Sequence, residues 1–357
     1  MPLPVKHRAA LVKEFGKPLV VEEIPTPEPR DRQVLIKVVG AGICHTDVHV
    51  WKGDWSVAGI PPKLPFILSH EVVGTIAAKG DKVPDDLKEG RNVLVYAWQW
   101  SRDDVYVAKG LTQLSEYPAH MAIVADGGMQ EYYLVSDYRF LVSVDGLEDL
   151  PAVAPLACAG LTTYRAVKRI LSHLEPDDYV AVIGLGGLGS YAIQWIRALA
   201  PYVNLIGVAG RDESLEFASR IVKLDATVNT SKVDPAKAIM EITKGRGLKA
   251  VVDTVGTETT IMVYTSLLTK MGVHMIVGMI GGEAKISPLL PFIVNERILT
   301  GSIVGSLGEQ IDVVTAAKRG MVNYRAVVTR RLKLEEVTEG LEALEKRRAL
   351  GRQVVVL

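Results

Sequence analysis

The first part of the chain consists of short apolar runs separated by glycine and proline. β-Branched and aromatic residues fill four such runs, at 33–39, 72–77, 92–96 and 131–135. Runs of this length between Gly and Pro predict short strands joined by turns. Their irregular spacing favours a barrel-like β domain with long loops, the kind of loop that commonly carries functional residues.

Near Pro151 the pattern changes, and strands begin to alternate with helices. The predicted strands lie at 179–183, 204–208, 250–253 and 272–277, with helical segments between them that include 190–199. Such alternation predicts an α/β domain in which a parallel sheet is covered by helices on both faces.

After Gly301 the chain is expected to leave this sheet. A helix rich in Glu, Lys and Arg is predicted at 334–347, and a terminal strand at 353–357. With 357 residues in total, the chain is too long for one ordinary domain, so we expect two.

Composition narrows the class of protein. The formal net charge is zero and the pI is about 7.1, which gives no reason to expect a nucleic-acid or membrane partner. The N-terminal segment lacks the apolar core of a signal peptide, and no apolar run approaches the ~18 residues that span a bilayer. We therefore predict a cytoplasmic protein. Asparagine occurs only five times, a scarcity that favours a thermophilic source.

Candidate metal ligands cluster in the first part of the chain. Of only 2 cysteines and 7 histidines, Cys44 and His70 lie within one short segment and offer the sulfur and nitrogen ligands that Zn²⁺ prefers. The second cysteine, Cys158, is on its own consistent with a small buried apolar residue. If the fold brings it to the other two, zinc would have three protein ligands and an open fourth position, which is the arrangement of catalytic sites.

A glycine-rich turn follows the strand at 179–183. Gly184, Gly186 and Gly189 form a GxGxxG pattern, with Gly187 inside it, directly before a predicted helix. In this context the pattern predicts a dinucleotide site, because the turn lets the backbone approach a pyrophosphate at a helix N-terminus. The alternative is a flexible turn in an unrelated α/β domain.

The residues after the strand at 204–208 indicate whether NAD(H) or NADP(H) binds. An NAD site places an acidic residue there to accept hydrogen bonds from the ribose, but this chain has Ala209. Gly210 makes room, and Arg211 can pair with a 2′-phosphate, so NADP(H) is favoured over NAD(H). In the competing interpretation, Asp212 reaches back to the ribose of NAD(H) and Arg211 is only solvated.

Together these motifs resemble the zinc-dependent medium-chain alcohol dehydrogenases over essentially the whole chain. The resemblance rests on 42–49, His70-Glu71, 155–164, the glycine pattern and Gly351-Arg352. It implies a GroES-like β-rich catalytic domain at 1–159, a Rossmann dinucleotide-binding domain at 160–303, and a return to the catalytic domain at 304–357.

The resemblance also implies the roles of individual residues. Cys44, His70 and Cys158 are similar to the ligands of one catalytic zinc, and Glu71 to an acidic neighbour that can approach the metal. Asp47 resembles the carboxylate that orients the ligand imidazole. The remaining implied roles concern protons and cofactor: Thr46 and His49 as a proton relay, His45 and Arg352 at the pyrophosphate, and Thr162 behind the nicotinamide.

The function implied is the interconversion of alcohols and aldehydes or ketones by hydride transfer to and from a nicotinamide cofactor. Zinc would act as a Lewis acid, and Thr46 and His49 would carry the alcohol proton away. A homo-oligomer, dimer or tetramer, is also implied. Two alternatives remain: a sugar or polyol dehydrogenase on the same scaffold, and a nucleotide-binding relative without catalysis.

The chain departs from this family in the lobe between Gln99 and His120. Many relatives hold a second, structural zinc there with four cysteines, whereas this chain has none, so we predict packing by aromatic side chains such as Trp98. Carboxylates and an imidazole are the alternative hard ligands: Asp103, Asp104, Glu116 and His120. A second departure is Ser69, where relatives carry glycine before the His-Glu pair.

Overall fold

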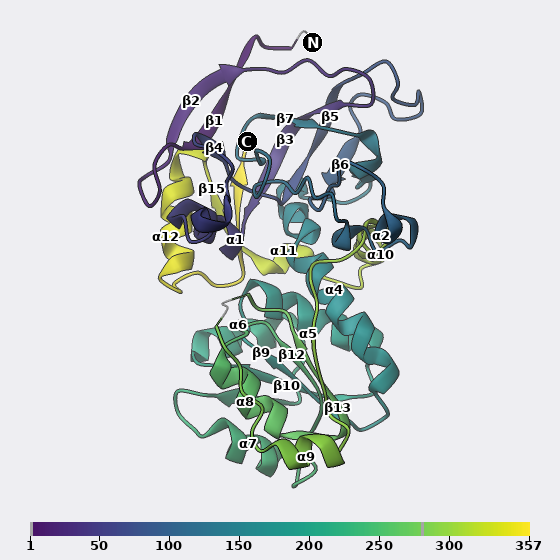
Figure 1. Ribbon diagram of the computed structural model, residues 1–357, viewed down its shortest axis with the longest axis vertical. Helices are drawn as coiled ribbons and strands as arrows, with labels where there is room; N and C mark the ends of the chain where they lie inside the picture. Colours follow the sequence, from purple (N-terminus) through teal and green to yellow (C-terminus); the bar gives the residue numbers. More distant parts are fainter. Residues whose placement is uncertain (1–2, 280–281) are drawn as a thin grey trace. The chain divides into compact units, whose positions relative to one another are not determined.

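The computed structural model describes residues 3–279 and 282–357, which divide into two compact units (Figure 1). The first contains the described residues up to Cys158, together with Gly305–Arg319 and Val328–Leu357. The second contains the described residues of Ala159–Val304 and Gly320–Val327. The predicted return at 304–357 is therefore interrupted. Asn323 donates its backbone N–H to Gln194 Oε1 at 2.6 Å and so ties the segment 320–327 to the second unit.

The described residues of the second unit form a six-stranded parallel sheet in the order β11-β10-β9-β12-β13-β14. The strands are β9 (Tyr179–Ile183), β10 (Asn204–Ala209), β11 (Ala226–Asn229), β12 (Leu248–Asp253), β13 (Leu268–Ile276) and β14 (Ile298–Gly301). The order reverses between β9 and β12, which is the switch point where open sheets of this kind bind ligands. The predicted α/β class with a doubly wound parallel sheet is confirmed.

Alternation along the strands directs side chains to both faces of this sheet. Ala181 and Ile183 of β9 share a buried cluster with Ile239 and Tyr264. Those two come from α7 (Pro235–Ile242) and α8 (Glu258–Ser266), while α5 (Gly187–Leu199) contacts β9 and β10. The remaining helices of this unit are α4 (Ala159–Ile170), α6 (Asp212–Ile221), α9 (Leu289–Val294) and α11 (Tyr324–Val327), with η5 (Leu171–His173) after α4.

The first unit is β-rich, as predicted, and its described residues form two sheets. One has the order β2-β1-β4, from β1 (Lys6–Val12), β2 (Val20–Pro25) and β4 (Phe66–Ile67). The other has the order β15-β16-β3-β5-β6-β8, with β7 paired to β3. Its strands are β3 (Val34–Ile43), β5 (Val72–Lys79), β6 (Asn92–Val95), β7 (Tyr132–Val135), β8 (Leu141–Ser143), β15 (Val328–Leu332) and β16 (Arg352–Val356).

The helices of the first unit are short, apart from α10 (Leu307–Lys318), which Ser306 and Glu309 cap at its start. The single helix predicted at 334–347 is divided into η6 (Leu334–Glu336) and α12 (Val337–Glu345). The other elements are α1 (His45–Lys52), α2 (Val105–Ala108), α3 (Leu150–Val153), η1 (Ser56–Ala58), η2 (Thr112–Leu114), η3 (Tyr138–Phe140) and η4 (Ala154–Ala157). Among all described helices of both units, none combines the length and apolarity that crossing a membrane requires.

Strand pairing brings three chain segments to one edge of the larger sheet. β3 and β5 are antiparallel, with Ala41 opposite Val72. β16 is also antiparallel to β3, with Gln353 opposite Ile43. The end of β3 therefore lies beside the beginnings of β5 and β16, and residues just outside these strands converge.

One carboxylate holds together the lobe between Gln99 and His120. Asp104 Oδ1 accepts the backbone N–H groups of Tyr106 (2.8 Å) and Val107 (2.9 Å), while Oδ2 accepts Ser115 Oγ (2.8 Å) and the backbone N–H of Glu116 (2.7 Å). These bonds hold the pKa of Asp104 below its usual value against the effect of burial. Because both oxygens are engaged, Asp104 is unsuited to the alternative role of a metal ligand.

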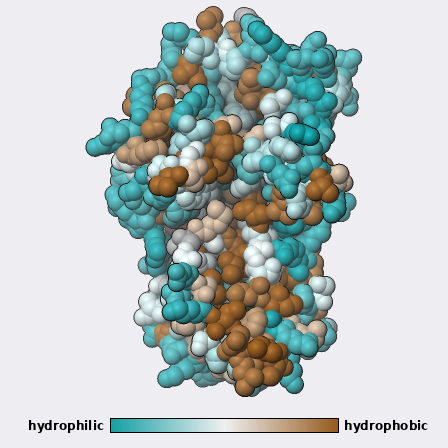
Figure 2. Space-filling model, in the orientation of Figure 1, coloured by the Kyte–Doolittle hydropathy of each residue, from teal (hydrophilic) through white to brown (hydrophobic). Residues whose placement is uncertain are grey.

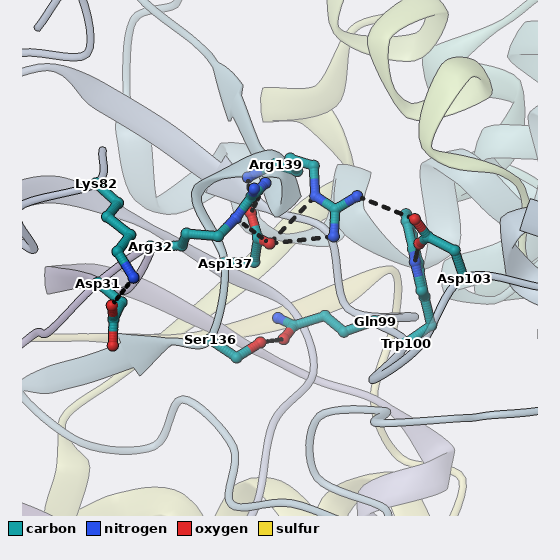
Figure 3. A network of polar contacts seen from close by, with 9 residues as sticks. All are labelled: Asp31, Arg32, Lys82, Gln99, Trp100, Asp103, Ser136, Asp137 and Arg139. Carbon is teal, nitrogen blue, oxygen red and sulfur yellow. Dashed lines mark hydrogen bonds and ion pairs between the residues drawn. The ribbon is translucent and has the colours of Figure 1, made fainter. Parts of the chain in front are cut away.

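Ion pairs connect the same lobe to the sheet (Figure 3). Trp100 Nε1 donates to Asp103 Oδ1 at 2.7 Å, and Asp103 Oδ2 lies 3.6 Å from Arg139. Arg139 and Arg32 both pair with Asp137, the N-cap of η3. The predicted packing by aromatic side chains is thus supplemented by a polar network that the sequence did not suggest.

We expect Asp104→Ala to loosen the lobe without unfolding the protein. The amides of Tyr106, Val107 and Glu116 lose a charged acceptor, so their protection against hydrogen exchange should fall by about tenfold or more. Asp85→Asn is the matched control, because its exposed carboxylate only approaches Lys79 at 3.6 Å. Unchanged protection at all three amides in Asp104→Ala would show that the lobe is held by other contacts.

Candidate active site

Four side chains with metal-binding atoms meet where the end of β3 lies beside the beginnings of β5 and β16. Cys44 follows β3 and is the N-cap of α1, His70 and Glu71 directly precede β5, and Cys158 follows η4. One potential ligand atom from each lies within 4.8 Å of all the others. In residues 3–279 and 282–357, this is the one group of three or more Cys, His, Asp or Glu side chains so placed.

The donor atoms of this cluster have few partners within the protein. Both ring nitrogens of His70 and Oε2 of Glu71 are buried without a hydrogen-bond partner within residues 3–279 and 282–357. Buried polar atoms are normally satisfied, so unpaired atoms facing one another indicate a place for a ligand. Two sulfurs and an imidazole nitrogen are a donor set suited to Zn²⁺, and the residues present therefore fit a bound zinc ion.

Electrostatics within the cluster favour one thiolate. A hydrogen bond from Cys158 lowers the pKa of Cys44 well below its usual value, with His70 contributing, and the same bond raises the pKa of Cys158. Burial opposes protonation of His70, but the charge of Cys44 outweighs it and raises the pKa of His70 to about 9. Without metal, the cluster therefore carries protons at neutral pH that a metal ion must displace.

Metal affinity should consequently depend on pH. Because His70 must lose its proton to become a ligand, Zn²⁺ affinity should rise from about pH 6 to about pH 9, by up to about tenfold per pH unit for each proton released. Calorimetry in buffers of different ionisation enthalpy measures the protons released. Affinity independent of pH in this range would contradict a site built from His70 and the two thiols.

Glu71, the fourth member of the cluster, pairs with Arg352. The Arg352 guanidinium contacts Glu71 Oε1, and both side chains are buried. A Cβ on Gly42 would lie 2.0 Å from Glu71 Oε2, so glycine is needed for the carboxylate to occupy this position. Arg352, expected at a pyrophosphate, is thus held beside the metal-binding cluster in this structure.

Asp47 connects the two loops that carry Cys44 and His70. Its carboxylate accepts the backbone N–H of Cys44 and of Ser69, each at 2.8 Å, and does not bond the His70 ring, contrary to the implied role. Ser69 has a left-handed backbone with φ of 75°, which explains why glycine suits this position. Its hydroxyl donates to the Gly42 carbonyl at 2.8 Å and so stabilises the strained turn.

The proposed relay residues lie on α1. Thr46 Oγ1 is 3.8 Å from Cys44 Sγ, so the hydroxyl is adjacent to the cluster. His49 Nδ1 is 2.7 Å from Asp54 Oδ2, and its ring stacks on Trp55 with centroids 5.1 Å apart. The exposed His45 lies beside it, with ring centroids at 5.4 Å. Sequence reasoning missed Asp54, which follows the left-handed turn at Gly53.

The glycine turn of the second unit has the expected local geometry. Gly184 has φ of 85°, and a Cβ on Gly189 would lie 1.9 Å from the Gly184 carbonyl oxygen. Around Gly186, the N-cap of α5, an added Cβ would meet no atom within 4 Å, and Gly187 begins the helix. Thr162 on α4 is buried in the same unit, and its hydroxyl has no hydrogen-bond partner in the described part of the chain.

The residues after β10 form a second polar group in this unit. Arg211 is the N-cap of α6, and its Nη2 lies 3.3 Å from Ser214 Oγ. Asp212 is bonded on both oxygens, to Asn229 Nδ2 at 2.6 Å and to Lys232 Nζ at 2.5 Å, and Lys232 lowers its pKa. An added Cβ on Gly210 would make only ordinary contact with Thr230, at 3.5 Å.

Comparison with known proteins places these sites in one family. Residues 30–146 match the family described as "Alcohol dehydrogenase GroES-like domain", and residues 187–319 match "Zinc-binding dehydrogenase". The chain is 39% identical to an NAD-dependent alcohol dehydrogenase of Sulfurisphaera tokodaii, covering 98% of this chain and 99% of that protein. The chain belongs to the zinc-binding alcohol dehydrogenase family.

Other members of the alcohol dehydrogenase family show its range. A D-arabinose 1-dehydrogenase (NADP(+)) of Saccharolobus solfataricus is 33% identical, with 98% of both chains covered. The crystal structure of the alcohol dehydrogenase from the hyperthermophilic archaeon Aeropyrum pernix matches with a TM-score of 0.88 and 35% identity, over 98% of this chain and 100% of that one. The predicted family, GroES-like and Rossmann fold and enzyme class are confirmed. The protein is an oxidoreductase of the alcohol dehydrogenase type.

Proposed function

We propose that the enzyme interconverts alcohols and aldehydes or ketones with one catalytic zinc and NADP(H). The observation that carries the proposal is the buried cluster of Cys44, His70 and Cys158, in which both His70 nitrogens lack a partner. Bound zinc would supply Lewis acidity that favours ionisation of the substrate alcohol. Glu71 would lie next to the zinc without binding it, because its carboxylate is paired with Arg352.

The side chains of this protein would then handle the proton. Thr46, next to Cys44, accepts the alcohol proton at its hydroxyl oxygen while donating its own toward His49. Asp54 holds His49 Nδ1 and so leaves Nε2 to exchange protons with water. The stacking of Trp55 on His49 keeps the imidazole ring in place.

The preference for NADP(H) rests on three features of the second unit. Ala209 supplies no carboxylate at the end of β10, and Arg211 and Ser214, 3.3 Å apart at the start of α6, would offer a charge and a hydroxyl to a 2′-phosphate. Asp212, the residue on which the alternative NAD(H) interpretation depended, is occupied by Asn229 and Lys232. Named relatives use either cofactor, so the proposal is specific to these residues.

Elemental analysis and turnover together test the proposal. Purified enzyme should contain one zinc ion per chain and oxidise simple alcohols with NADP⁺, and chelation of the metal should abolish turnover. Two tightly bound zinc ions would show that the lobe around Asp104 also binds metal. Zinc-free protein without dehydrogenase activity on alcohols or sugars would favour a nucleotide-binding relative.

We also propose that the enzyme is a homo-oligomer and that α9 forms part of the interface. Leu289, Leu290, Ile293 and Val294 are between 57% and 69% exposed, close in sequence to the edge strand β14. Figure 2 shows hydrophobic side chains gathered over this part of the second unit. An apolar patch beside a strand edge is suited to pairing with a second copy of the chain.

Light scattering tests this interface. The wild-type enzyme should be at least a dimer, and Leu290→Lys combined with Ile293→Lys should shift it to the monomer, because buried lysines disfavour the apolar contact. Val57→Lys is the control, since Val57 is fully exposed in the other unit. A wild-type monomer would contradict the proposal.

A further inference from the structure

The indole of Trp98 and the imidazole of His120 form an edge-to-face pair in the first unit, with ring centroids 4.3 Å apart. Two backbone hydrogen bonds hold their segments together: Ala119 donates to Gln99 at 2.9 Å and Met121 to Ala97 at 3.1 Å. These backbone bonds keep the two segments adjacent, so that the two rings can contact each other.

This pair lies close to the metal-binding cluster. Trp98 comes three residues after Val95, whose register partner on β5 is Val72, and His70 precedes Val72 by two residues. The charge of His70 also acts on His120, since it adds to burial in lowering the pKa of His120 to about 4. The imidazole of His120 is consequently neutral at physiological pH and can either donate or accept a hydrogen bond.

The polar atoms of the pair have no hydrogen-bond partner among the residues that the structure describes. Trp98 Nε1 and His120 Nε2 are both buried without a hydrogen bond. Three other indoles of the chain are satisfied: Trp51 donates to the Lys17 carbonyl, Trp100 to Asp103 and Trp195 to the Gly160 carbonyl. Unpaired buried polar groups are costly, and at a functional site they indicate atoms that a substrate satisfies.

The chemistry of the two atoms defines what they can bind. Trp98 Nε1 only donates, and a neutral His120 Nε2 can accept. A hydroxyl group satisfies both atoms, because its oxygen accepts a hydrogen bond from the indole N–H and its O–H donates one to His120 Nε2. A methyl or methylene group at the same place would leave both atoms unpaired, which is how a polar site rejects an apolar analogue.

We propose that Trp98 and His120 bind a second hydroxyl group of the substrate, so that the enzyme prefers diols and hydroxyaldehydes to simple alcohols and aldehydes. This inference rests on the proposed function, because the pair is placed relative to the proposed metal ligands. It specifies the substrate class of that same site. His120 is thereby a residue that contacts substrate, and not a ligand of a second metal.

Matched substrates that differ by one hydroxyl group provide the test. With wild-type enzyme, kcat/KM should be at least about tenfold higher for propane-1,2-diol than for propan-1-ol, and for glycolaldehyde than for acetaldehyde. His120→Phe and Trp98→Phe should each bring these ratios close to one, while His120→Gln, which keeps a donor and an acceptor, should retain part of the preference. Because both substrates of a pair are assayed on the same preparation, the ratio of their kcat/KM values does not depend on how much of a variant is folded.

Trp100→Phe is the matched control. It removes an indole N–H from the same segment, but one whose acceptor is Asp103, so the ratios should be unchanged. Calorimetry should also show weaker binding of propane-1,2-diol, without turnover, to Trp98→Phe than to Trp100→Phe. Wild-type ratios near or below one, or ratios unaffected by both Phe variants, would overturn the inference. Turnover of propan-1-ol in the same assay would leave the proposed function standing, and its absence with every substrate would refute that function instead.

Discussion

Cys44→Ser and His70→Ala are each expected to reduce kcat/KM for alcohol oxidation by about a thousandfold or more. Metal catalysis contributes several kcal/mol of charge stabilisation in the transition state, and each 1.36 kcal/mol corresponds to a factor of ten. Both side chains offer their ligand atoms to the one cluster that includes Cys158 and Glu71. Losing either leaves too few donors to hold zinc tightly.

Cofactor binding should survive these substitutions. The glycine turn and Arg211 belong to the second unit, whereas Cys44 and His70 belong to the first. Fluorescence titration with NADPH should therefore give a similar Kd for wild-type and variant protein, while elemental analysis shows the zinc lost. His173→Ala, in η5 of the second unit, is the matched control and should keep both zinc and activity. Substantial turnover by zinc-free Cys44→Ser would refute the metal mechanism.

The sequence could identify the residues of this site, but it could not show that they converge. Cys44, His70 and Cys158 were identifiable because thiol and imidazole side chains are rare in this chain and have few other reasons to occur in loops. Their convergence could not be derived from spacing. It depends on the antiparallel pairing of β3 with β5 and β16, which joins residues far apart in sequence.

Other features depended on contacts with no sequence signal. Arg352 meets Glu71 across 281 positions of the chain, and the sequence assigned it only to a cofactor. The sequence could not distinguish the structural role of Asp104 from that of the neighbouring acids. Its four hydrogen bonds come from backbone N–H groups and a serine, which are donors that any sequence supplies. Asp54 could have been found from the sequence, because Gly53 before it marks the turn that brings the Asp54 carboxylate back to His49.

The fold itself was more predictable than its boundaries. The strand at 179–183, the glycine turn and the following helix were all identified, because periodicity and turn chemistry are local. The transfer of 320–327 to the second unit was not, since it depends on Gln194 accepting one backbone N–H from a distant segment. The change from the 3-10 turn η6 to the α-helix α12 likewise falls within a run whose charge pattern suits one helix.

Arg211→Ala should weaken NADPH binding by about tenfold to a hundredfold and leave NADH binding nearly unchanged. Hydrogen bonds to charged groups contribute roughly 1.5–3 kcal/mol, and only the phosphorylated cofactor offers a 2′-phosphate to the guanidinium. Arg211 begins α6 beside Ser214, so the loss of one side chain removes the charge while the helix keeps its start. Fluorescence titration of both cofactors measures the two affinities.

Ala209→Asp should change the cofactor preference from NADPH to NADH. A carboxylate at the end of β10 would accept the ribose hydroxyls of NADH and repel a 2′-phosphate, so NADH affinity should rise as NADPH affinity falls. Arg220→Ala is the control, because it removes an arginine from the last turn of the same helix α6. If the wild-type enzyme binds NADH at least as tightly as NADPH, the interpretation of Ala209, Gly210 and Arg211 is wrong. Asp212 would then have to exchange Lys232 and Asn229 for the ribose, and Asp212→Asn would weaken NADH instead.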